Sequence, residues 1–216
     1  MIYWVFICMS FSVCIAAVIA VFRYRRMDPA FLPFILCIWI AALNEMISFG
    51  LAHNGLSNLA NNNIYILIEG LLILWQFKKW NLFYGVKQVW VMLMLVLTGV
   101  WFYEIHSRSS LQDLHYYYRL ICAVIVIICS INFNNRLIIS HSKTLLRNPA
   151  FLISTGYIIY YTFKILTDTY WLYKSDSSHS FLYAVYYIIA WNNLAVNLIF
   201  IIAILWIPRK PNYINF

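Results

Sequence analysis

The stretch NIYILIEGLLILWQF at residues 63–77, followed directly by Lys78 and Lys79, decides how the chain is laid out. This run is short for a membrane-crossing helix, which needs about 20 residues, and Glu69 lies inside it. The lysines that follow favour a crossing, because cytoplasmic loops are enriched in lysine and arginine. With this span, 11 of the 15 basic residues fall on the inner side. Without it, Lys78, Lys79 and Lys87 would lie outside and the asymmetry would disappear.

The composition of the whole chain is that of a helical membrane protein. Hydrophobic residues make up 64% and charged residues 10% of the 216 positions, whereas soluble domains have about 45–50% and about 25%. The apolar runs are continuous rather than alternating, which favours helices over barrel strands. The net charge of +8 does not indicate nucleic-acid binding, because the basic residues fall in alternate loops. The partner predicted first is therefore a lipid bilayer.

Hydropathy and charge together predict an all-α membrane protein with seven transmembrane helices. We expect one domain over 1–208, with the N-terminus outside and the C-terminus in the cytoplasm, and a short basic cytoplasmic tail at 209–216. The predicted spans are about 2–22, 30–52, 62–77, 88–105, 115–134, 149–173 and 181–207.

Two helix starts carry the same local signal. Asp28-Pro29 and Asn148-Pro149 each place a capping side chain before a proline, at the cytoplasmic ends of the second and sixth spans. The sequence Pro-Ala-Phe-Leu follows at both places, at 29–32 and 149–152. This match leaves open an internal repeat of three helices, a linker helix and three helices.

Ionisable residues inside the predicted spans mark the candidate functional site. Such groups cost on the order of 2.5–3.5 kcal/mol each at a helix centre, so they are usually functional or paired. On the sixth span, Lys164 and Asp168 are four residues apart and can form an ion pair along the helix. The predicted ligand-binding residues of an outward-opening polar cavity are Glu45, Glu69, Tyr161, Lys164, Asp168, Arg119 and Asn193.

Polar stripes suggest which spans line this cavity. The third span repeats a polar residue at steps of seven, at Asn62, Glu69 and Gln76. Similar stripes predict that the second, third, sixth and seventh spans surround the cavity. The alternative is that these groups only join helices, by hydrogen bonds worth roughly 1 kcal/mol each. We assign that linking role to Asn192.

No pattern in the sequence predicts a catalytic residue, a cofactor or a metal site. The motifs GxSxG and HExxH are absent, and no two histidines have the i, i+3 or i, i+4 spacing of a helical metal site. Histidines predicted on the outer side leave sensing of external pH open. The five cysteines lie in apolar runs without a CxxC pair, which favours helix packing.

One combination of residues resembles a known group of proteins. Asn44-Glu45, Tyr65 with Glu69, and Asn148-Pro149-Ala150-Phe151 followed by Gly156 and Tyr160 are similar to short, uncharacterised bacterial membrane proteins with seven helices. The resemblance covers nearly the whole chain. It implies a bacterial inner (cytoplasmic) membrane and carries no activity with it.

Three functions are compatible with these features. The first is a receptor- or sensor-like module that takes a small-molecule or ion ligand from the outer side and works with a separate cytoplasmic or membrane signalling partner. The second is a small-solute or ion transporter, which would use the repeat described above. The third is an intramembrane enzyme that acts on lipid, with Glu45 and Glu69 as acid and base.

Overall fold

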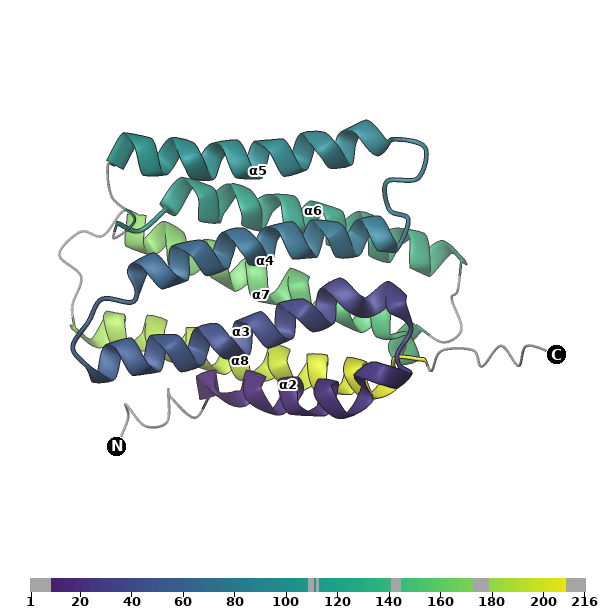
Figure 1. Cartoon of the computed structure of the whole chain (residues 1–216), viewed down its shortest axis with the longest axis horizontal. Coiled ribbons are helices and arrows are strands. Elements are labelled where there is room, and N and C mark those ends of the chain that lie inside the picture. The colour runs from purple at the N-terminus through teal and green to yellow at the C-terminus, as the bar shows by residue number, and fades with distance from the viewer. Residues whose placement is uncertain (1–8, 109–110, 112, 141–144, 173–178, 209–216) are drawn as a thin grey trace.

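A computed structural model shows long helices lying side by side in a bundle (Figure 1). The structure describes residues 9–108, 111, 113–140, 145–172 and 179–208, and in these ranges it contains helices and no strand. The described α-helices are α2 (Ser12–Arg23), α3 (Leu32–His53), α4 (Leu59–Lys79), α5 (Lys87–Arg108), α6 (Tyr116–Ser140), α7 (Pro149–Leu172) and α8 (His179–Trp206). Short 3-10 turns are η1 (Tyr24–Arg26), η2 (Pro29–Phe31) and η3 (Leu145–Arg147). The predicted all-α class is confirmed for this part of the chain.

Five helical segments are long and apolar enough to cross a membrane, which supports a protein integral to the membrane. They are Pro29–His53, Lys87–Ser107, Tyr116–Ile139, Pro149–Tyr170 and Ala184–Trp206. Helix α4 covers the predicted span 62–77 but is not among them, because it carries several polar residues. Helix α2 has 12 described residues, and residues 2–8 of the predicted span 2–22, like the tail 209–216, lie outside the described residues. Seven crossings stay a prediction.

The described helices form a closed arrangement in which α8, the last of them, packs against α2, the first of them. Helix α2 packs against both α3 and α8, α7 lies between α6 and α8, and α4 contacts α3, α5 and α6. Helix α5 lies at the edge of the bundle (Figure 1). The α2–α3 and α4–α5 connections lie at one end, which we call the basic end, and the α3–α4 connection lies at the opposite end.

Side-chain caps fix the helix starts at the basic end. Asp28 Oδ1 accepts a hydrogen bond from the Ala30 amide at 2.8 Å, and Asn148 Oδ1 accepts one from the Ala150 amide at 2.9 Å. The two predicted caps are therefore confirmed. Each occupies one of the backbone donors that the first turn of a helix leaves without an intrahelical partner.

Gln76 caps a neighbouring helix instead of lining a cavity. Its Oε1 accepts from the Phe34 amide at 2.8 Å, and its Nε2 donates to the Ala30 carbonyl at 2.7 Å. The side chain is fully buried, at 0% exposure. The Gln76 side chain thus provides an acceptor for a backbone donor in the first turn of α3 and a donor for a backbone acceptor in η2.

The Glu104 side chain of α5 likewise caps the first turn of α6. It is 1% exposed, and its two carboxylate oxygens accept from the Tyr117 and Tyr118 amides at 3.1 and 2.8 Å. A negative charge at this position also favours the positive end of the helix dipole. Glu104 is accordingly part of the structural frame of the bundle.

Gly70 allows α4 and α6 to approach closely. A Cβ atom at this position would lie 2.8 Å from Tyr118 Oη and 2.9 Å from Cys122 Sγ. Small residues have this role at many helix contacts in membranes. The close approach turns the face of α4 that bears Glu69 into the interior of the bundle.

Candidate functional site

Two adjoining cavities lie among α3, α4, α7 and α8, and Val13 of α2 lines the first while Arg119 of α6 lines the second. We call the first the tyrosine cavity; it has a volume of about 80 Å³ and includes the side chains of Tyr65, Tyr157, Tyr160 and Tyr161. The second, the charged cavity, has a volume of about 290 Å³ and includes Glu45, Arg119, Lys164 and Asp168. The residues that line both cavities are Glu45, Tyr65, Tyr160 and Asn193.

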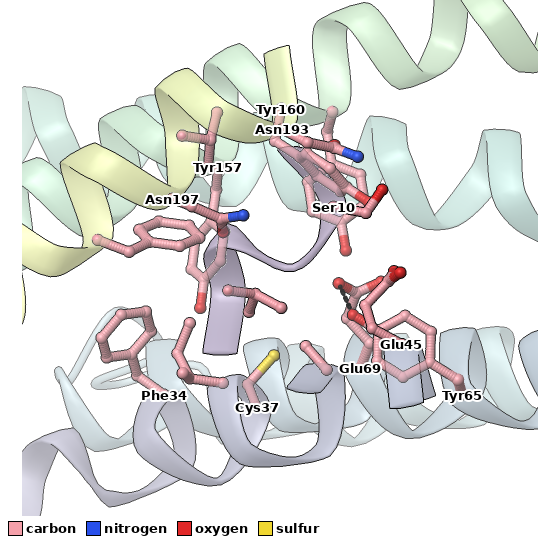
Figure 2. Close-up of a pocket in the computed structure, with 16 residues that line it drawn as sticks. Ser10, Phe34, Cys37, Glu45, Tyr65, Glu69, Tyr157, Tyr160, Asn193 and Asn197 are labelled. Atoms are coloured by element: carbon pink, nitrogen blue, oxygen red, sulfur yellow. Dashed lines mark hydrogen bonds between the residues drawn. The ribbon is translucent and has the colours of Figure 1, made fainter. Parts of the chain in front are cut away.

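Helix spacing explains how the tyrosine cavity is built. Tyr65 and Glu69 are one turn apart on α4, and the Tyr65 hydroxyl donates to Glu69 Oε1 at 2.7 Å. Figure 2 shows this bond beside Glu45, with Asn193 on the other side of the cavity. Tyr160 and Tyr161 follow Tyr157 by three and four residues on α7, so both lie on the same side of the helix as Tyr157.

Aromatic rings close the tyrosine cavity toward the basic end. The Phe34 and Phe200 ring centroids are 5.3 Å apart, and those of Tyr157 and Phe200 are 5.6 Å apart. Gly156 makes room for this contact, because a Cβ there would lie 2.5 Å from Phe200 Cε1. Cys37 also lines the cavity, between Phe34 and Glu45 in the view of Figure 2.

The polar groups of the tyrosine cavity are acidic or neutral. Glu69 is 8% exposed and Glu45 is half-buried. The hydroxyls of Tyr157 and Tyr161 have no hydrogen-bond partner among the described residues. No lysine or arginine belongs to the described lining of this cavity. Its walls therefore offer carboxylates, hydroxyl oxygens and aromatic faces.

The charged cavity holds buried ions of both signs that do not contact each other. Arg119 and Asp168 are each 7% exposed. Arg119 Nε and Nη2 and Asp168 Oδ2 find no hydrogen-bond partner in the part of the chain that the structure describes. Buried charges without partners are costly, so this arrangement indicates a place where a polar ligand would be stabilised.

The ion pair that the spacing of Lys164 and Asp168 permits is not seen as a direct contact among the described side chains. Among the described side chains the two form no hydrogen bond, and the Lys164 Nζ lies over the rings of Tyr160 and Tyr161 instead, at 5.2 and 5.8 Å from their centroids. The i, i+4 spacing permits the pair, but the aromatic faces attract the ammonium toward the boundary between the two cavities. Asp168 is left available to other groups.

The seven predicted ligand-binding residues all line one cavity or both. Glu69 and Tyr161 line the tyrosine cavity, Arg119, Lys164 and Asp168 line the charged cavity, and Glu45 and Asn193 line both. Their role in binding stays a prediction.

Several residues that line the cavities were not among the predicted binding residues. Tyr65 and Tyr160 line both cavities, and their spacing from Glu69 and Tyr161 was the available signal. Asn192 lines the charged cavity in addition to donating to the Tyr160 carbonyl at 3.5 Å.

The described walls of the two cavities offer carboxylate, basic, hydroxyl, amide and aromatic groups. The described residues contain no group of three or more His, Cys, Asp or Glu side chains that could hold a metal ion. The donors and acceptors without partners are instead suited to a small molecule with charged ends. Comparison with known proteins adds no relative, since no family model, curated protein or solved structure matches the chain.

Proposed function

We propose that this protein is a receptor-like membrane protein that binds a small polar molecule in the two adjoining cavities and works with a separate signalling partner. The observation that carries the proposal is that Arg119 and Asp168, which are buried and oppositely charged, line one cavity and keep polar atoms without a partner among the described residues. A bound molecule with matching charges offsets the cost of burying both.

The proposed orientation places all seven helices across a bacterial inner membrane, with the N-terminus outside and the C-terminus inside. It is supported by the basic end, whose turns carry Arg23, Arg25, Arg26, Lys78, Lys79 and Lys87. Such residues favour the cytoplasmic side. The resemblance to short bacterial membrane proteins supports the choice of membrane. In this orientation the charged cavity faces the outer half of the bilayer, so the ligand enters from outside.

Contacts of α8 offer a route from the cavities to the basic end. Asn193 lines both cavities, and Asn197 donates to Ser12 Oγ on α2 at 2.7 Å. At the end of α8, Arg23 Nη2 donates to the Ile207 carbonyl at 3.3 Å. A ligand that moves α8 therefore also moves the basic α2–α3 turn, where a cytoplasmic partner would read the change.

Thermal unfolding of the purified protein tests the proposal. Small molecules that raise the unfolding midpoint of the wild type should lose this effect in Glu69→Ala and in Lys164→Ala, because both side chains line the cavities. Lys79→Ala is the matched control, since Lys79 is exposed at the basic end. Equal shifts in all three variants, or no shift with any compound, would contradict the proposal.

A transporter is the second candidate, favoured by the depth of the cavities. Together they extend from Asp168, near one end of α7, to Phe34, in the first turn of α3 at the other end of the bundle. Helices that surround a site near the middle of the membrane are typical of transporters. Uptake of a labelled ligand into proteoliposomes separates the two functions, since a receptor gives no flux above that of empty vesicles.

A further inference from the structure

The charges around the two cavities are unequal. Among the described lining residues there are three carboxylates, Glu45, Glu69 and Asp168, and two cations, Arg119 and Lys164. With formal charges, the site is one positive charge short of neutrality. A ligand with a net charge of plus one would balance it. This reasoning rests on the proposed binding function and narrows the class of ligand.

The charged cavity requires a ligand with groups of both signs. Two buried guanidinium nitrogens of Arg119 have no partner in the part of the chain that the structure describes, and a guanidinium matches the two oxygens of a carboxylate. Asp168 Oδ2 also lacks a partner within the described ranges and can accept from an ammonium group. Arg119 and Asp168 line the same cavity of about 290 Å³. A carboxylate and an ammonium on neighbouring atoms, as in an α-amino acid, meet both needs at once.

The tyrosine cavity requires a second cation. Glu45 and Glu69 line it without a lysine or arginine in its described wall. Tyr157 and Tyr161 are 3% and 2% exposed, and their hydroxyls, which find no partner among the residues described, can accept from N–H groups. Their rings attract a cation. Its volume of about 80 Å³ equals the space of roughly five to eight water molecules. That is room for the end of a side chain rather than for a whole ligand.

We propose that the two cavities together bind an α-amino acid with a basic side chain. Its carboxylate lies at Arg119 and its α-ammonium at Asp168 in the charged cavity. Its side chain passes Tyr160 and Asn193, which belong to both cavities, and its terminal ammonium lies between Glu45 and Glu69. The ligand's net charge of plus one is the charge that the site lacks.

Binding of lysine and of its truncated analogues to the protein in lipid nanodiscs tests this proposal, with isothermal titration calorimetry as the readout. Norleucine lacks the side-chain ammonium, 6-aminohexanoate lacks the α-ammonium and 1,5-diaminopentane lacks the carboxylate. Each should bind at least about tenfold more weakly than lysine, because each leaves a buried group without its partner. This part of the experiment uses only the wild-type protein and is independent of how variants fold.

Variants that each remove one side-chain charge assign each ligand group to its place. Glu69→Gln should weaken lysine about tenfold and leave norleucine unchanged. Arg119→Gln should leave 1,5-diaminopentane unchanged, and Asp168→Asn should leave 6-aminohexanoate unchanged. An unfolding midpoint like that of the wild type, measured without ligand, shows that each variant is folded.

The results separate this proposal from the broader one. If norleucine binds as tightly as lysine, or if lysine does not bind while another compound gives a thermal shift that Lys164→Ala removes, the ligand class is overturned and the binding function stands. If neither lysine nor any other compound binds, both proposals are overturned.

Discussion

Helices α4 and α5 follow each other along the chain and contact each other, but their surroundings differ. Helix α5 lies at the edge of the bundle (Figure 1), and only 17% of the residues in the most apolar stretch of its segment Lys87–Ser107 are buried. Helix α4 is enclosed by α3, α5 and α6. It carries Asn61, Asn62, Asn63, Glu69 and Gln76, of which Asn63 and Gln76 are 0% exposed.

The comparison shows what hydropathy measures in this bundle. An apolar helix is suited to face lipid, whereas a helix enclosed by protein can carry polar groups that its neighbours satisfy. Asn63 Nδ2 donates to the Leu111 and Asp113 carbonyls at 2.9 and 2.6 Å, and Gln76 bonds to α3 and η2. The low hydropathy of α4 therefore reflects its central position.

The largest expected effect concerns whether α4 crosses the membrane at all. In a cysteine-free chain, Ser57→Cys and Tyr84→Cys should react with a membrane-impermeant maleimide from opposite sides, since the two exposed residues flank α4. Labelling in intact cells is compared with labelling after permeabilisation, and the result is all or none. If both positions react from the same side, α4 does not cross and the orientation proposed above fails.

The next largest effect is on stability and concerns the buried side-chain amide of Gln76 on α4. Gln76→Ala should lower the free energy of unfolding by about 2–4 kcal/mol, because it leaves the buried Phe34 amide and Ala30 carbonyl without partners. Denaturant titration of the detergent-solubilised protein measures it. Gln88→Ala on α5 is the matched control, and it should change stability by less than about 0.5 kcal/mol because Gln88 is exposed. Equal effects at the two positions would refute the contrast between the helices.

A smaller effect is expected from the glycines of the two helices. Gly70→Ala should destabilise by about 1–3 kcal/mol, since its Cβ would meet Tyr118 Oη at 2.8 Å. Gly99→Ala on α5 should be close to neutral, because a Cβ there meets nothing within 4 Å. The same titration measures both. Combining Gly70→Ala with Tyr118→Phe and Cys122→Ala should restore part of the loss, and a lack of any rescue would argue against the steric explanation.

The smallest expected effect concerns the carboxylate cap that α5 provides for α6. Glu104→Gln should cost about 1 kcal/mol, because the neutral amide caps α6 less well than the carboxylate does. Thr98→Ala serves as its control, since the Thr98 hydroxyl donates to the Met94 carbonyl within the same helix. If both variants have the stability of the wild type, α5 contributes no polar support to the bundle.

Local features of this fold were predictable from the sequence, and distant contacts were not. Asp28 and Asn148 each cap an amide two residues away, so the motif itself contains both partners. Gln76 shares a predicted stripe with Glu69, but its partner amide at Phe34 is 42 positions away. Hydropathy could not show that the start of α3 lies beside that end of α4.

The candidate site was predictable as a set of residues and not as a set of contacts. The high cost of ions in a bilayer identified Arg119 and Asp168, and helical periodicity placed Tyr161 on their side. The attraction of Lys164 to two tyrosine rings depends on side-chain rotamers, which spacing does not determine.

The contact between α2 and α8 has a consequence for how the chain is made. The Trp39 indole bonds to the Ala17 carbonyl across 22 positions, so α2 and α3 can associate early in translation. The bond from Asn197 to Ser12 spans 185 positions, so it cannot form until Asn197 has been synthesised and has left the ribosome. Until then, the first helix has lipid or a chaperone in place of its final neighbour. The contact between α2 and α8, and the part of the tyrosine cavity that Asn197 lines, are therefore completed only after this part of α8 has been made.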